Sequence, residues 1–136
     1  MITIKSKKEI ELIRESCRIT AGAHKEMEKA IKPGVSTLEL DKIAEKYIKS
    51  CGAIPSFKGY NSKLKNVPDY PATACISINE EVIHGIPSSK TYLREGDIVS
   101  IDLGAYKNGF HGDAARTYIV GNVGDRCPRS FEQCRM

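Results

Sequence analysis

Long hydrophobic runs are missing from this sequence of 136 residues. No apolar stretch approaches the roughly 18–20 residues that a transmembrane helix needs. Residues 1–8 (MITIKSKK) also lack the apolar core of a secretion signal. These absences argue against a membrane protein and predict a cytoplasmic location. Hydrophobic residues make up 40% of the chain and charged residues 28%, which is the balance of one globular domain with its own core.

A strong excess of one charge sign is missing as well. The chain has 21 basic and 17 acidic residues, spread along its length, so its net charge of +4 predicts no specific binding of nucleic acid. The five cysteines are odd in number and form no CxxC pair, which favours free thiols in a reducing compartment over a disulfide framework. No glycine-rich phosphate loop follows a predicted strand, so nothing indicates a nucleotide cofactor.

Hydrophobic residues recur with helical spacing in the N-terminal third of the chain. The spacing predicts one helix from about residue 6 to residue 32, ended by a Pro-Gly pair. A second helix is predicted to begin at Ser36, with Glu39 as its capping-box partner, and to end near Gly52. Residues 55–71 are rich in proline, glycine, asparagine and lysine, which predicts a long loop.

The rest of the chain has the pattern of short strands. Residues 72–78 predict a strand, and residues 82–84 predict a segment that runs back beside it. A hairpin is predicted from residues 98–106 and 110–120, joined by the two-residue turn Asn-Gly at 108–109. Two helices followed by strands predict an α+β fold, with the helices packed on one face of an antiparallel sheet.

The predicted turn determines which residues of the hairpin face each other. Asp102 would lie opposite Ala115, and Asp113 would lie opposite Gly104. The two carboxylates are then diagonal neighbours on one face, with Cβ atoms roughly 7–8 Å apart, and they repel each other unless a divalent cation binds between them. Gly104 would leave space for a ligand beside Asp113. The alternative is that this face is simply the solvent side of the sheet.

Other candidate residues each allow a structural interpretation beside a functional one. His84 could donate a hydrogen bond to a substrate carbonyl, or it could be a turn histidine bonded to backbone. His111 could be a metal ligand, a partner of a ligand or a solvated side chain. His24, within the first helix, is interpreted as structural, and Cys75, within an apolar strand, as a core residue rather than a nucleophile.

Three motifs in order along the chain carry a resemblance to a known family. They are residues 75–87 (CISINEEVIHGIP), 96–102 (GDIVSID) and 109–113 (GFHGD), and the upstream segments IKPGVST and GAIPSF agree with them. Over about residues 1–122 the chain resembles the type I methionine aminopeptidases, and the upstream segments are similar to bacterial members. The resemblance implies half of a pita-bread fold, with the metal-binding hairpin in its sheet. It also implies removal of the initiator methionine from nascent polypeptides, a step in protein maturation.

The resemblance also implies roles for individual residues. Asp102 and Asp113 match two ligands of a site for two divalent metal ions, with cobalt, manganese and iron as candidates and zinc as a further one. Asp113 matches the carboxylate that bridges both ions, and His84 matches the histidine that contacts the substrate and helps to stabilise the transition state. Cys75 and Tyr70 match positions that line the pocket for the methionine side chain. The implied partners are nascent polypeptides with an N-terminal methionine and the surface of the ribosome.

Two departures from the family pattern affect these expectations. Residues 62–69 look like an insertion beside the pocket, and nothing after Asp113 matches the one histidine and two glutamate ligands and the general base of the family's second half. We therefore expect residues 1–121 to form the N-terminal half of a catalytic domain and residues 122–136 to form a divergent, disordered tail. We also expect little or no peptidase activity from this chain alone. The alternative is a non-catalytic binding module or an inactive fragment of the same fold.

Overall fold

Both helices begin at capping boxes, of which the sequence predicts the one at Ser36 and Glu39. In the computed structural model, which describes residues 3–61, 63 and 66–122, α1 covers Lys7–Ala30 and α2 covers Thr37–Ser50. The Glu9 carboxylate accepts from the Ser6 amide at 2.7 Å, and the Ser6 hydroxyl accepts from the Glu9 amide at 3.3 Å. An equivalent pair of bonds between serine and glutamate starts α2. Each pair satisfies amide groups that the first turn of a helix leaves free.

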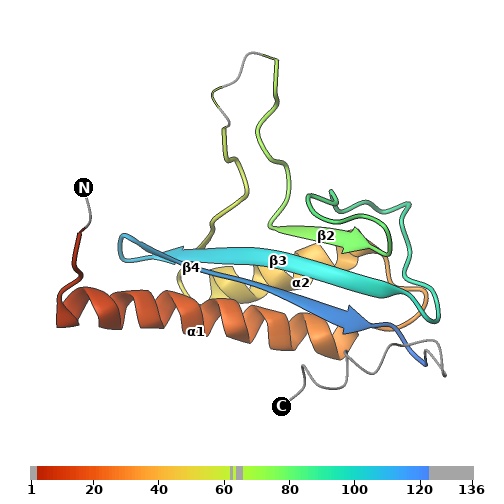
Figure 1. Cartoon of the computed structure of the whole chain (residues 1–136), viewed down its shortest axis with the longest axis horizontal. Coiled ribbons are helices and arrows are strands. Elements are labelled where there is room, and N and C mark those ends of the chain that lie inside the picture. The colour runs from red at the N-terminus through yellow and green to blue at the C-terminus, as the bar shows by residue number, and fades with distance from the viewer. Residues whose placement is uncertain (1–2, 62, 64–65, 123–136) are drawn as a thin grey trace.

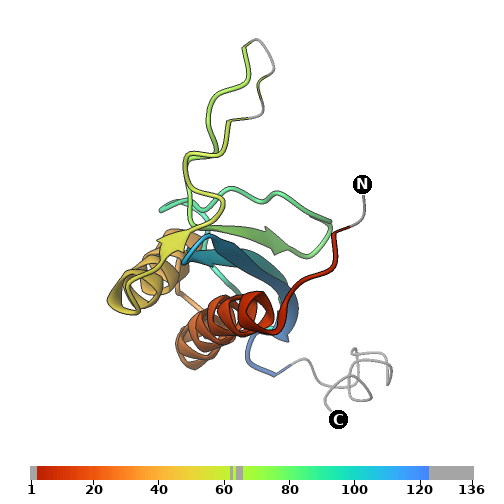
Figure 2. The same ribbon diagram turned by 90° about the vertical axis from the view of Figure 1, so that its left-hand side faces the viewer.

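Strand β3 (Ile98–Lys107) is the centre of a four-stranded antiparallel sheet. Strand β4 (Phe110–Ile119) pairs with all ten residues of β3 across the predicted Asn-Gly turn. Strands β1 (Ile54–Pro55) and β2 (Ala74–Ile78) therefore share the opposite edge of β3. Both helices pack on one face of this sheet, as Figures 1 and 2 show, and the predicted α+β fold is confirmed.

The strand predictions differ from the structure at three points. Strand β1 lies where the sequence predicts the start of a loop, because a strand of two residues is too short to show a period and exists only through its pairing with β3. Strand β2 begins at Ala74 rather than at residue 72. Residues 82–84 form no strand, and the chain returns to β2 at Gly85, whose carbonyl accepts from the Ile76 amide at 2.8 Å.

The hydrophobic core lies between the helices and the sheet. Val99, Ile101 and Leu103 of β3 are fully buried, and they belong to one cluster with Met27 of α1 and Leu40 of α2. Burying an aliphatic side chain of this size contributes about 1.5–3 kcal/mol. Because successive side chains of a strand point to opposite faces, the even-numbered residues of β3 lie on the face away from the helices.

A long loop between β1 and β2 stands away from the sheet (Figures 1 and 2). At its base the Gly59 amide donates to the Tyr70 carbonyl at 2.8 Å, and the Tyr70 amide donates to the Tyr60 carbonyl at 3.0 Å. Farther out, the Asn61 amide group donates to the Asp69 carboxylate at 2.7 Å. Residues 62, 64 and 65 of the proposed insertion lie outside the described residues, and so does most of the predicted tail, from residue 123 onward.

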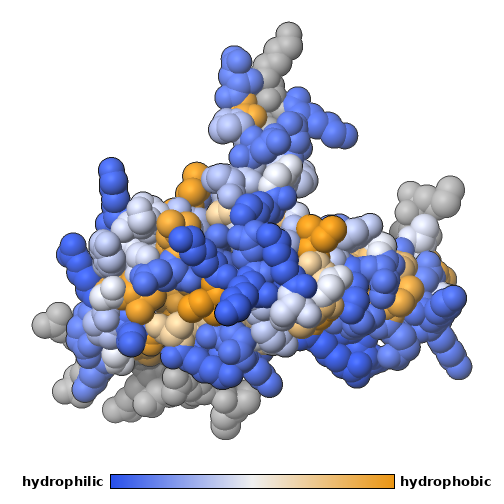
Figure 3. Space-filling model, turned by 180° about the vertical axis from the view of Figure 1, so that it is seen from behind, coloured by the Kyte–Doolittle hydropathy of each residue, from blue (hydrophilic) through white to orange (hydrophobic). Residues whose placement is uncertain are grey.

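The surface opposite to the view of Figure 1 is mainly hydrophilic, with hydrophobic residues in small separate groups (Figure 3). Neither helix of the described part of the chain combines the length and apolar character needed to cross a bilayer.

Candidate metal and substrate site

The β3–β4 hairpin places Asp102 and Asp113 on one face of the sheet, with the register that its turn predicts. Asp102 is paired with Ala115, and Asp113 is paired with Gly104. The two carboxylates are therefore diagonal neighbours on the face away from the helices. Asp102 is partly buried and Asp113 is exposed, so the pair lies at the open surface of the sheet.

The two carboxyl groups are close enough to interact. Burial raises the pKa of Asp102 above its ordinary value, and the charge of Asp113 and a hydrogen bond between the two side chains raise it further. The charge of His84 lowers the pKa of Asp102, which indicates that this histidine lies near the pair. A divalent cation would relieve the repulsion between the carboxylates, and carboxylate oxygens are ligands that such cations prefer. The two aspartates therefore fit a metal site by their chemistry.

The described residues supply only part of a complete metal site. Within residues 3–61, 63 and 66–122, no group of three or more histidine, cysteine, aspartate or glutamate side chains is placed to hold a metal ion. Two carboxylates leave most coordination positions of a divalent ion to water or to other groups. Asp102 and Asp113 alone would therefore not complete the coordination of a divalent ion.

His84 is held near the carboxylates by the glycine that follows it. The Gly85 amide donates to the Ser77 hydroxyl at 3.0 Å, and its carbonyl accepts from the Ile76 amide at 2.8 Å. A Cβ atom at residue 85 would overlap the Ile76 carbonyl oxygen, so only glycine lets the chain come this close to β2. His84 itself has a φ of 63°, a left-handed conformation that is uncommon for residues other than glycine. The chain thus presents an exposed imidazole from a constrained backbone.

Cys75 and Tyr70 lie on the β2 side of Asp102. Cys75 is paired with Asp102 across β2 and β3, and it is 6% exposed. The Tyr70 hydroxyl donates to the Ala74 carbonyl at 3.0 Å, which joins the end of the long loop to the start of β2. Burial raises the pKa of the Tyr70 hydroxyl and of the Cys75 thiol, so both groups are neutral at pH 7. A neutral, buried thiol is not an activated nucleophile, which agrees with the interpretation of Cys75 as a core residue.

Asp41 of α2 supports the start of β2, a contact that the sequence pattern did not reveal. Its side chain is 3% exposed, and one carboxylate oxygen accepts from the amides of Thr73 and Ala74 at 2.9 and 2.8 Å. Burial raises the pKa of Asp41, while the two hydrogen bonds from backbone amides act in the opposite direction. The available signal was its position next to Leu40 on the buried face of the helix, where a carboxylate needs a partner.

His111 is bonded to Ser56. Its Nδ1 atom lies 2.9 Å from the Ser56 hydroxyl, and its ring centroid lies 4.5 Å from that of Tyr106. The expectation of free space at Gly104 is wrong, because a Cβ atom there would lie 3.0 Å from the Ser56 side chain. The cause is the unpredicted strand β1, which continues into a bond from the Ser56 amide to the Gly104 carbonyl at 2.9 Å.

The class of the protein follows from this fold and from a family comparison. The chain belongs to metallopeptidase family M24, because the model of that family matches residues 11–135. Membership in this family implies divalent metal ions, which agrees with the pair of carboxylates on the hairpin.

The most similar relatives considered are bacterial methionine aminopeptidases. The chain is 54% identical over 125 residues to methionine aminopeptidase 1 of Bacillus subtilis, covering 92% of this chain and 47% of that protein. It is 50% identical over 129 residues to methionine aminopeptidase of Clostridium acetobutylicum, covering 95% of this chain and 49% of that protein. The chain thus spans about half the length of the curated relatives it matches.

Solved structures of the same family share the fold. Methionine aminopeptidase of Thermotoga maritima matches with a TM-score of 0.86 and 38% identity, over 99% of this chain and 50% of that one. Prolidase of Pyrococcus furiosus matches with a TM-score of 0.71 and 29% identity, over 90% of this chain and 33% of that one. The two helices and four strands correspond to half of the pita-bread fold, and the family and fold predicted from the three motifs are confirmed.

Proposed function

We propose that this chain carries one half of the active site of a methionine aminopeptidase, which removes the initiator methionine from nascent polypeptides. The main support is the grouping of Asp102, Asp113 and His84 at the open face of the sheet, where the charges of Asp113 and His84 act on Asp102. The likeness in sequence to methionine aminopeptidases, up to 54% identity in the comparisons given above, supports the same function.

Asp102 and Asp113 are proposed to hold divalent metal ions, with two ions in the complete site and cobalt, manganese, iron or zinc as candidates. Bound at such a site, divalent ions polarise a carbonyl group and activate water as a nucleophile. The contribution of this chain is two negatively charged oxygen ligands whose separation is set by the register of β3 and β4. Asp113, the more exposed of the two, is the one proposed to bridge both ions.

Substrate contacts are proposed for the other three residues. The exposed imidazole of His84 would donate a hydrogen bond to the carbonyl oxygen of the scissile peptide, where negative charge develops in the transition state. Cys75 and Tyr70 would line the site of the methionine side chain, and the buried thiol and the half-buried phenol, both neutral, suit a thioether side chain. A nascent polypeptide as substrate also implies work in the cytoplasm and at the ribosome surface.

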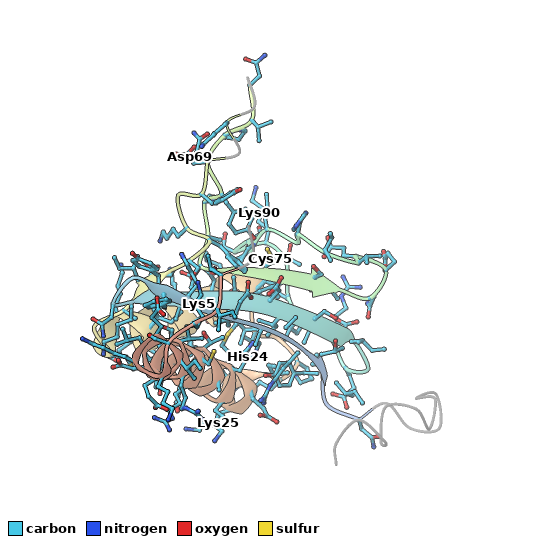
Figure 4. The ribbon with its side chains drawn as sticks, turned by 60° about the vertical axis from the view of Figure 1, so that its left-hand side comes forward. Lys5, His24, Lys25, Asp69, Cys75 and Lys90 are labelled. Atoms are coloured by element: carbon cyan, nitrogen blue, oxygen red, sulfur yellow. The ribbon has the colours of Figure 1, made fainter. Side chains whose placement is uncertain are left out.

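Metal binding by the 136-residue chain tests this proposal directly. We expect titration with MnCl2 in a calorimeter to show a saturable site that Asp113→Asn abolishes. The matched control is Asp69→Asn, which removes the same charge from the long loop, far from Cys75 in Figure 4. Equal Mn²⁺ binding by the wild type and both variants would contradict the proposal and favour a binding module that does not use these carboxylates.

Peptidase activity gives a second test. We expect the chain alone to release no methionine above background from a peptide that begins with methionine, even with Mn²⁺ present. The reason is that the described residues contribute only two carboxylate ligands at the site. Robust release that a chelator abolishes would show that this chain is sufficient for the reaction.

A further inference from the structure

Helix α1 is joined to strand β4 by a row of three side chains. Ser16, Thr20 and His24 recur every fourth residue, so they lie on one face of the helix, and all three are buried. Each bonds one backbone carbonyl of β4 at 2.9 Å, in the pairs Ser16 with Phe110, Thr20 with Gly112, and His24 with Ala114. The row therefore joins α1 to β4 at three alternate residues of the strand.

The spacing of the helix matches the spacing of the strand. Four residues of an α-helix rise about 6 Å, and two residues of a β-strand rise about 6.6–6.8 Å. Side chains at every fourth position of α1 can therefore meet carbonyls at every second position of β4. The helix also comes very close at this point, because a Cβ atom at Gly112 would overlap the backbone of Ser16 and Cys17.

In each of these bonds the side chain of α1 is the donor. A carbonyl only accepts, so Nε2 of His24 carries the hydrogen toward Ala114, and Nδ1 accepts from the Tyr118 hydroxyl at 3.0 Å. Figure 4 shows His24 between α1 and the sheet. The hydroxyls of Ser16 and Thr20 have second, longer contacts, at 3.4 Å to the Lys107 carbonyl and at 3.1 Å to the Ser16 carbonyl. The bonds to β4 are thus the shorter ones in both cases.

Two of these bonds flank Asp113. In an antiparallel pair, alternate residues direct their backbone groups to the partner strand, and the residues between them direct theirs to the other edge. The Gly104 carbonyl accepts from the Ser56 amide on the β1 side, so the backbone groups of Gly104 and of its partner Asp113 face away from each other. The backbone groups of Gly112 and Ala114 face β3, and their carbonyls accept the bonds from Thr20 and His24 in addition. The chain is therefore held on both sides of Asp113, at Gly112 and at Ala114, by the bonds from α1 and by the pairing with β3.

We propose that Thr20 and His24 are positioning residues for Asp113 and that they hold its carboxylate where it can share a divalent ion with Asp102. The inference rests on the proposed function, because it concerns a ligand of the proposed metal site. Groups that orient a ligand from behind raise metal affinity by removing the need to order that ligand on binding. Ser16 makes the same kind of bond three residues away from Asp113, so it provides an internal control.

The test compares Mn²⁺ affinity with thermal stability in variants of the 136-residue chain. We expect Thr20→Val to weaken Mn²⁺ binding about tenfold, the lower end of the effect seen when a group that orients a ligand is removed. Ser16→Ala should leave Mn²⁺ affinity close to that of the wild type, although both variants lower the midpoint of thermal unfolding. Thr20→Ser should restore the affinity, because it restores the hydroxyl donor.

The outcomes separate the positioning role of Thr20 and His24 from the proposed metal site itself. If Thr20→Val and Ser16→Ala change Mn²⁺ affinity equally, positioning is overturned while the metal site stands. If Asp113→Asn binds Mn²⁺ as the wild type does, the proposed function fails and the positioning role fails with it. Should Thr20→Val not fold, Thr20→Ala is measured in its place. If neither folds while Ser16→Ala does, the hydroxyl serves folding rather than positioning, and the proposal is overturned.

Discussion

The two faces of strand β3 differ in burial and in polarity, although both belong to one strand. On the face toward the helices, Val99, Ile101 and Leu103 are fully buried in the core. On the opposite face, Ser100 and Asp102 are only partly buried, and Asp102 interacts with the exposed Asp113. A shift of the register by one residue would exchange the two faces, which the buried side chains prevent. Packing on one face thus fixes the positions of the candidate metal ligands on the other.

The largest expected effect comes from the buried face. We expect Leu103→Ala to lower the free energy of unfolding by about 3–4 kcal/mol, because it removes a fully buried side chain and leaves a cavity. The control is Ser100→Ala on the polar face, which removes a hydroxyl bonded to Thr117 at 2.9 Å and should have a much smaller effect. Urea unfolding of both variants measures the difference. Equal losses would show that the two faces do not differ as described.

A somewhat smaller effect is expected at the support of β2. Asp41→Ala would leave the buried amides of Thr73 and Ala74 without an acceptor, so we expect a loss of about 2–3 kcal/mol in unfolding free energy. Asp41→Asn keeps an oxygen that can accept both bonds, and it removes the negative charge that burial disfavours, as the raised pKa of Asp41 indicates. The unfolding free energy of Asp41→Asn should therefore fall clearly less than that of Asp41→Ala. If Asn and Ala cost the same, the two hydrogen bonds do not stabilise the strand.

The row of bonds on α1 predicts a pH dependence. Burial lowers the pKa of His24 from its ordinary value of 6.5, so the unfolded chain binds the proton more tightly than the folded chain. Stability from this group is complete above pH 6.5 and is lost as the pH falls below it. Between pH 7.5 and 5.5 we expect a loss of up to about 1.4 kcal/mol. The control His24→Gln cannot titrate there, so an equal pH dependence in both proteins would contradict this account.

The smallest expected effect is a gain in stability rather than a loss, and it concerns Asp102. Burial and the neighbouring Asp113 raise the pKa of Asp102, so the ionised form is disfavoured in the folded chain. In a chelating buffer at pH 7, Asp102→Asn should therefore stabilise the chain by less than about 1 kcal/mol, since the site is partly open to solvent. Added Mn²⁺ should reverse the order by stabilising the wild type alone. A variant that is less stable than the wild type in both buffers would contradict the repulsion between the carboxylates.

The parts of this fold that could be predicted from sequence are those with local causes. The capping boxes of both helices and the Asn-Gly turn depend on a few adjacent residues, and the turn alone set the pairing of Asp102 with Ala115. Strand β1 could not be predicted, because two residues become a strand only through pairing with β3. The filled space at Gly104 depended on the same pairing.

The surroundings of the candidate site were harder to predict than its central residues. The motif gives His84 and Gly85, but only the structure shows that Gly85 lies against the Ile76 carbonyl and that His84 takes a left-handed conformation. Asp41 interacts with residues more than thirty positions away, and Thr20 with residues more than ninety positions away. Local sequence patterns contain no information about partners at such distances.

The most direct test of the central claim is whether Asp102 and Asp113 bind one divalent ion together. Paramagnetic Mn²⁺, added below stoichiometry, broadens amide signals near the site where it binds in an NMR spectrum of the chain. The account predicts that the signals of Asp102, Asp113 and His84 broaden first, and that either Asp102→Asn or Asp113→Asn removes the broadening at all three. Undiminished broadening at Asp102 in the Asp113→Asn variant, or broadening that begins elsewhere in the chain, would contradict it.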